Sequence, residues 1–170
     1  MNGYIEIYKY LKAYSRCLNR LVLHNKSHIP TILKMVPLKA PGHGIRANVF
    51  PEPITHISLE NDNTNGIYTK MIVWNPMAEI PFHSHDISHC YFQALRPRLI
   101  QTMSENHKGE IITKEISTEE YTYFHKSMGG HRLVNQRQFS PNVSFHLYVR
   151  DEFDDYRNHI EHNEDQYERI

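Results

Sequence analysis

Three of the thirteen histidines and one of the two cysteines lie within ten consecutive residues, Pro81-Phe82-His83-Ser84-His85-Asp86-Ile87-Ser88-His89-Cys90. In an extended strand, residues i and i+2 project from the same face, so His83 and His85 can reach one point in space. Two imidazoles that meet at one point indicate a metal ligand pair. An isolated His-x-His pattern is also compatible with a histidine-rich surface strand, so further ligands are needed to decide between the two interpretations.

Length and composition predict a single domain. The 170 residues are 39% hydrophobic and 22% charged, with nineteen basic and nineteen acidic side chains. Such a chain can bury its own core, and we expect a monomer. Zero net charge argues against nucleic acid as a partner, and no apolar run reaches the roughly 18 residues of a membrane span. Two cysteines and the absence of a signal-peptide pattern at the N-terminus predict a cytoplasmic protein.

Hydrophobic periodicity predicts a helix followed by strands. Residues 4–23 place apolar side chains at helical spacing, including Cys17, which we expect to be buried there, and a short helix is possible at residues 30–35. From Ile54 onward the pattern changes to short strands separated by turns, whereas residues 75–81 resemble a loop. The expected organisation is an N-terminal helix and loop at 1–53, a β-barrel at 54–150 and an acidic segment at 151–170. Strands without a βαβ rhythm favour an antiparallel sandwich or small barrel.

Two later stretches supply candidate site residues. At Gly129-Gly130-His131 a glycine turn delivers a histidine to the start of a strand, which makes His131 the natural third metal ligand. Residues 143–149 alternate strictly, so that Ser144, His146 and Tyr148 share one face. That polar face can lie in water over an apolar core, or it can line the interior of a small barrel. The alternation alone does not choose between these arrangements.

These residues resemble the cupins, and within them the thiol dioxygenases, most closely cysteine dioxygenase. The cupin pattern is matched by His83-x-His85 and His131-x-x-x-Asn135, with Cys90 at the place of the usual acidic ligand. The stretch from His83 to Cys90, the Ser144-x-His146-x-Tyr148 pattern and Trp74 are also similar to this family. The resemblance covers roughly residues 54–150 and implies a mainly β, cupin-type barrel or jelly roll with the N-terminal helix packed outside.

The resemblance implies an iron enzyme with a protein-derived cofactor. Fe(II) would be held by His83, His85 and His131, and Cys90 would be joined to Tyr148 by a thioether, with Ser144 and His146 orienting the tyrosine. Three-histidine sites also suit catalytic zinc, but a Cys–Tyr pair has no use in zinc hydrolysis. The implied partners are a small thiol and dioxygen.

The region expected to bind the substrate departs from the family. An early-strand arginine that holds the substrate carboxylate is replaced by Thr55-His56-Ile57. The sequence offers Arg157 as the leading replacement, with Arg46 and Arg150 as weaker ones, and Trp74 and His56 as further residues of the pocket. We expect oxidation of cysteine to cysteine sulfinic acid. The alternatives are oxidation of another small thiol such as 3-mercaptopropionate, a metal hydrolase or isomerase, and a cupin that binds metal without catalysis.

Overall fold

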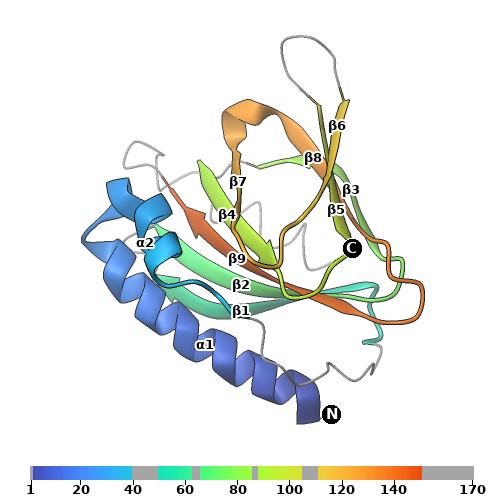
Figure 1. The fold of residues 1–170 in the computed structure, drawn as a ribbon, viewed down its shortest axis with the longest axis horizontal. Coiled ribbons are helices and arrows are strands. Elements are labelled where there is room, and N and C mark those ends of the chain that lie inside the picture. Colours follow the sequence, from blue (N-terminus) through green and yellow to red (C-terminus); the bar gives the residue numbers. More distant parts are fainter. Residues whose placement is uncertain (1, 40–49, 63–65, 86–87, 105–110, 151–170) are drawn as a thin grey trace.

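The structure, a computed structural model, describes residues 2–39, 50–62, 66–85, 88–104 and 111–150. Within these described residues, nine strands form two antiparallel sheets that face each other (Figure 1). The first sheet has the order β1 (Ile54–Asp62), β2 (Ile67–Trp74), β9 (Asn142–Val149), β4 (His89–Ala94), β7 (Thr122–His125). The second has the order β3 (Glu79–Ser84), β8 (Gly130–Asn135), β5 (Leu99–Ser104), β6 (Ile111–Glu115). This architecture is the cupin-type β-barrel expected from the sequence.

One core lies between the two sheets and another lies under the helices. Side chains from both sheets meet in the first core, among them Trp74, Phe92, Leu99 and Leu133. The second core joins the outer face of the first sheet to α1 (Asn2–Leu23) and α2 (Ile29–Met35). All eight residues of β9 are buried, because its two faces belong to the two different cores. The polar face of residues 143–149 therefore lines the interior of the barrel.

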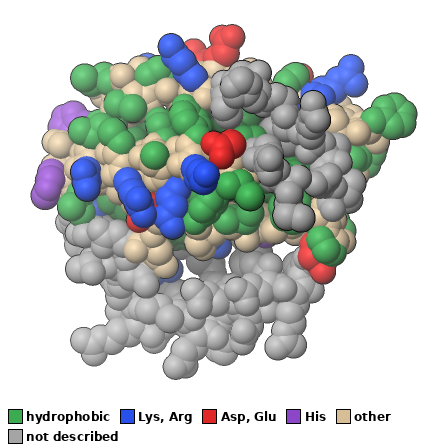
Figure 2. Space-filling model, turned by 90° about the horizontal axis from the view of Figure 1, so that it is seen from below, with side chains coloured by type: hydrophobic (Ala, Val, Ile, Leu, Met, Phe, Trp, Pro, Cys, Tyr) green, Lys and Arg blue, Asp and Glu red, His purple; other side chains and the backbone are tan. Residues whose placement is uncertain are grey.

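Helix α1 lies along the first sheet on the side away from the second sheet (Figure 1). Its apolar side chains recur every three or four residues and are buried, for example Ile7, Leu11 and Leu18. Each such side chain contributes about 1.5–3 kcal/mol on full burial. The outer face of the helix carries Lys and Arg side chains, which Figure 2 shows in blue. No helix of the described residues is long and apolar enough to cross a membrane.

The helices expected at residues 4–23 and 30–35 and the alternating strand at 143–149 are found within two residues of these bounds, but two expectations were wrong. Residues 79–81 belong to β3 rather than to a loop. Cys17 is exposed rather than buried, because the buried stripe of α1 runs through its neighbours Tyr14 and Leu18. Short 3₁₀ helices at Lys26–His28 and Lys126–Met128 were not expected.

Candidate metal centre

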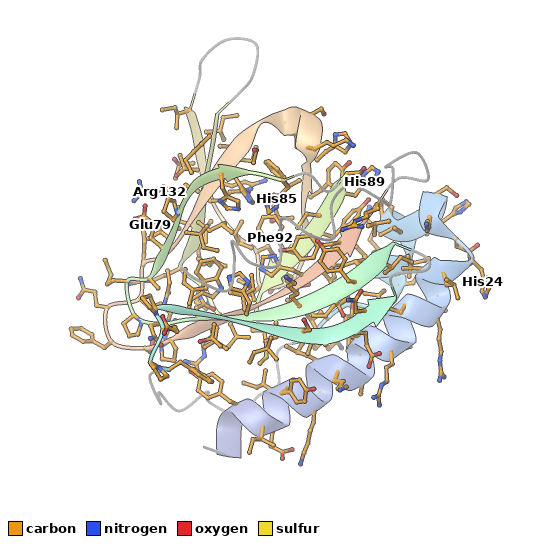
Figure 3. The ribbon with its side chains drawn as sticks, turned by 180° about the vertical axis from the view of Figure 1, so that it is seen from behind. His24, Glu79, His85, His89, Phe92 and Arg132 are labelled. Atoms are coloured by element: carbon orange, nitrogen blue, oxygen red, sulfur yellow. The ribbon has the colours of Figure 1, made fainter. Side chains whose placement is uncertain are left out.

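Three histidines converge at the end of the second sheet. His83 on β3 stands directly opposite His131 on β8, so their side chains lie on the same face, and His85 follows one residue after β3 ends. One ring nitrogen from each of the three residues lies within 4.8 Å of the others. The Nε2 atoms of His85 and His131 are 2.8 Å apart. Figure 3 shows His85 in the interior near Phe92, whereas Arg132 and Glu79 lie on the outer side of this sheet.

The surroundings keep His83 and His131 neutral, which is the form of imidazole that binds a metal. Burial, and then the nearby His85 and His83, lower the pKa of His131 to about 2. Burial also lowers the pKa of His83, whose Nδ1 donates to the carbonyl oxygen of Pro81 at 2.8 Å. That hydrogen bond leaves the Nε2 lone pair of His83 available. The ring of Phe124 stacks on His131 with centroids 4.2 Å apart and restricts its orientation.

Gln101 on β5 controls the tautomer of His131. The side-chain nitrogen of this buried glutamine lies 2.8 Å from His131 Nδ1, which in this arrangement accepts its hydrogen and leaves Nε2 to carry the proton toward His85. A metal needs the Nε2 lone pair, so the proton of His131 must move to Nδ1. Turning the amide then presents the Gln101 oxygen as the acceptor, because amide O and N occupy equivalent positions.

The role of Gln101 can be tested with two substitutions of similar size. In Gln101→Leu, His131 loses the acceptor for its Nδ1 hydrogen, and we expect metal affinity to fall about 10–100-fold. In Gln101→Glu, a carboxylate can accept that hydrogen, and affinity is retained within about tenfold. Titration of metal-free protein with Fe(II) under anaerobic conditions measures both. Equal affinities for the leucine and glutamate variants would contradict the role.

Cys90 and Tyr148 form a directly opposed pair on β4 and β9. Opposed residues of antiparallel strands have Cβ atoms about 4.5–5.5 Å apart and share one face. Both are nearly inaccessible, at 1% and 7% exposure. Burial raises the pKa of the Cys90 thiol, an effect that a hydrogen bond with Tyr148 partly offsets. A neutral, enclosed thiol of this kind is poorly suited to nucleophilic attack, so its chemistry is limited to its immediate neighbours.

A chain of hydrogen bonds leads through the core to Tyr148. The indole N–H of Trp74 donates to Ser144 Oγ at 2.8 Å, and Ser144 Oγ lies 2.7 Å from His146 Nε2. His146 Nδ1 lies 3.3 Å from the Tyr148 hydroxyl. Burial keeps the pKa of His146 well below its usual value, so the ring is neutral. An indole can only donate, so Ser144 Oγ accepts from Trp74; when the serine gives its own hydrogen to His146 Nε2, the Nδ1–H of the ring points to the oxygen of Tyr148.

The remaining candidates differ in position. Trp74 is fully buried behind Ser144, and its role toward a substrate stays a prediction. The His56 side chain on β1 is exposed at its edge, but the protein packed around its ring, then Lys70 and then His83 lower its pKa to about 4. Arg157 and Arg46 lie outside the described residues. Arg150 follows β9, and its backbone N–H donates to Gly66.

Sequence reasoning missed Gln101 and Lys70. The alternation of β2 puts Lys70 on the same face as Trp74, a signal that was present in the sequence. Nothing in the sequence of β5 distinguishes Gln101, because its contact with His131 depends on the pairing of β5 with β8.

The donor set fits a divalent transition metal. Three neutral imidazoles converging from β3, β8 and the residue after β3 leave the ion its full charge and open positions for further ligands. The two closest nitrogens already approach the spacing of neighbouring ligands on one ion, given metal–nitrogen bonds of about 2.0–2.1 Å.

The chain is similar to known cysteine dioxygenases. Cysteine dioxygenase type 1 of Rattus norvegicus is 32% identical over 94 residues, and that of Homo sapiens is 30% identical over 94 residues. Each match covers 51% of this chain and 47% of the relative, so the chain spans about half the length of the curated relatives it matches. No protein-family model matches the sequence.

A solved structure of oxalate oxidase, in complex with a substrate analogue, glycolate, shares the fold. Its TM-score is 0.50 at 12% identity, with 59% of this chain and 53% of that chain covered. The sequence similarity and the two-sheet fold together support a cysteine dioxygenase-like cupin.

Proposed function

We propose that this protein is an iron-dependent thiol dioxygenase that oxidises cysteine to cysteine sulfinic acid. In this reaction the thiol R–SH and O₂ combine to R–SO₂H, so both oxygen atoms end on sulfur and no other reductant is needed. The observation that supports the proposal best is the opposed pair of Cys90 and Tyr148 on the same barrel interior as the three histidines. A site for zinc hydrolysis or for simple metal storage gives no reason for that pair.

Each part of the site has a separate task. Fe(II) held by His83, His85 and His131 would supply the redox chemistry that joins the thiol to dioxygen. With the hydrogen-bond direction described above, His146 donates to the oxygen of Tyr148, and the tyrosine keeps its own hydrogen to donate. Tyr148 can therefore hydrogen-bond a substrate in the barrel interior, and Ser144 and His146 fix where its hydroxyl lies.

The proposal includes a thioether between Cys90 Sγ and the ring of Tyr148. Forming this bond removes one hydrogen from the thiol and one from the ring, and dioxygen is the oxidant that accepts the two electrons and two protons. Protein purified after aerobic turnover should contain a joined peptide pair that is lighter by two hydrogen atoms, as seen by mass spectrometry. The cross-link should be absent from protein kept anaerobic throughout.

Cys17 provides an internal control for this experiment because it is exposed, whereas Cys90 is buried. An alkylating reagent should modify Cys17 in the folded protein and both cysteines in unfolded protein that has never turned over. After turnover, unfolding should no longer release Cys90 for alkylation. If Cys90 remains fully alkylable after prolonged turnover, the thioether is not formed.

Oxygen consumption by iron-loaded protein tests the function itself. We expect consumption with cysteine and formation of one sulfinic acid per dioxygen, measured by an oxygen electrode and product mass. Assaying 3-mercaptopropionate and cysteamine in parallel identifies the preferred thiol. An iron-loaded protein that consumes no oxygen with any of the three thiols would leave metal binding without catalysis as the function.

A further inference from the structure

Lys70 brings a positive charge to the interior face of the first sheet. It lies on β2 directly opposite Ser58 of β1 and His146 of β9. Residues opposite one another share a face of the sheet, so Lys70 projects to the side that carries His146. Its side chain is partly buried. The positive charge therefore lies on the same interior face of the sheet as His146 and Tyr148.

The positive charge of Lys70 affects the pKa values of two imidazoles, those of His56 and His146. After burial, the positive charge of Lys70 is the next cause that lowers the pKa of His56. It also contributes, after burial and the charges of His56 and His85, to the lowered pKa of His146. The strand registers agree, because Lys70 stands directly opposite His146 on β9 and diagonally across from His56 on β1. Because the lowered pKa values keep His56 and His146 neutral, Lys70 supplies positive charge to this part of the interior.

Aromatic rings connect Lys70 to Tyr148. The ammonium nitrogen is 5.7 Å from the ring centroid of Tyr68. The Tyr68 ring in turn stacks on Tyr148, with centroids 4.7 Å apart and planes inclined by 15°. Cys90 stands opposite Tyr148 on the next strand. The cation thus lies along the wall where the proposed reaction takes place.

We propose that Lys70 binds the carboxylate of the thiol substrate. This inference rests on the proposed function and specifies its substrate class as small thiols that carry a carboxylate, such as cysteine and 3-mercaptopropionate. Such a substrate has a thiol at one end and a carboxylate at the other: an iron held by the three histidines would bind the sulfur, and Lys70 would pair with the carboxylate. Cysteamine, which has no carboxylate, lacks the second contact. A lysine offers a flexible point charge rather than the planar fork of an arginine.

Two substitutions separate charge from shape. Lys70→Met keeps an apolar stem and removes the charge, whereas Lys70→Arg keeps the charge. For each protein, loaded with iron, we would measure kcat/KM on cysteine, 3-mercaptopropionate and cysteamine. Calorimetry under anaerobic conditions gives the binding of the same thiols without turnover, and thermal unfolding shows whether each variant is folded.

Losing a charge-assisted hydrogen bond to the substrate corresponds to a roughly tenfold to 150-fold decrease in kcat/KM or in binding affinity. We expect Lys70→Met to lower the ratio of kcat/KM for cysteine over cysteamine by at least about tenfold, with a parallel change in the ratio of dissociation constants, and Lys70→Arg to preserve most of both. Equal decreases of kcat/KM on cysteine and on cysteamine, or full activity of Lys70→Met on cysteine, would overturn the role of Lys70. The proposed dioxygenase activity would still stand. Wild-type protein that neither binds nor oxidises any of the thiols would overturn both proposals.

Discussion

Replacing His131 with alanine is expected to abolish metal binding at concentrations that saturate the wild type. His131 supplies the most deeply buried of the three ligands, at 2% exposure, and its Nε2 lies 2.8 Å from that of His85. Loss of a ligand should exceed the 10–100-fold typical of partners that only orient a ligand. Metal analysis should therefore find less than a tenth of the iron of the wild type, and oxygen consumption with cysteine should fall to background.

Stability measurements give a second readout of the same loss. A metal present at 100 times its dissociation constant stabilises the folded state by about 2.7 kcal/mol, and the roughly 1,000-fold weaker affinity that leaves less than a tenth of the sites filled reduces this to about 0.1 kcal/mol or less. His24→Ala is the matched control, because His24 is exposed at the end of α1, far from His85 (Figure 3). If His131→Ala retained a full equivalent of iron and the wild-type stabilisation, the three-histidine site would be wrong.

Strands could be predicted where the sequence alternates clearly or is rich in β-branched residues. The prediction was wrong at Pro81. Proline interrupts most strands, so the segment before His83 was assigned to a loop. In the structure β3 is the edge strand of its sheet, and its register with β8 shifts between Ile80 and His83. Edge strands and irregular positions tolerate proline because no ladder hydrogen bond is lost there. The order of strands in the sheet, which places Pro81 on an edge strand, could not be read from the sequence.

The parts of the site that depend on local spacing were easier to predict than those that depend on register. His83 and His85 are separated by one residue, and their proximity follows from the chain itself. The opposition of Cys90 and Tyr148 requires β4 to pair with β9 in one register, and residue spacing alone does not specify that register. The resemblance to thiol dioxygenases implied this pair, whereas Lys70 and Gln101 have no counterpart in the patterns that carried the resemblance.

Gly130→Ala is expected to disturb the metal centre through the backbone. Gly130 begins β8 opposite Ser84 of β3. A Cβ atom at residue 130 would overlap the side chain of Phe82 and lie 2.9 Å from the carbonyl oxygen of His83. Phe82 is exposed and can turn away, but the His83 carbonyl belongs to β3, which carries the ligand His83 and leads directly to the ligand His85. We expect the free energy of unfolding to fall by about 1–3 kcal/mol, the usual cost of forcing extra atoms into a packed site.

The same change should weaken iron binding, because β3 can relieve the contact only by moving His83 relative to His131. Gly66→Ala is the matched control. It places alanine at φ 63° in the turn between β1 and β2, which contains none of the three ligands. The strain in the backbone costs about 1 kcal/mol. Chemical unfolding and anaerobic iron titration of both variants separate lost stability from lost affinity. In the double variant Phe82→Ala/Gly130→Ala the side-chain overlap is gone and the backbone contact remains, so iron affinity should stay low. Recovery of wild-type affinity in that double variant would show that Phe82, rather than the His83 carbonyl, carries the effect.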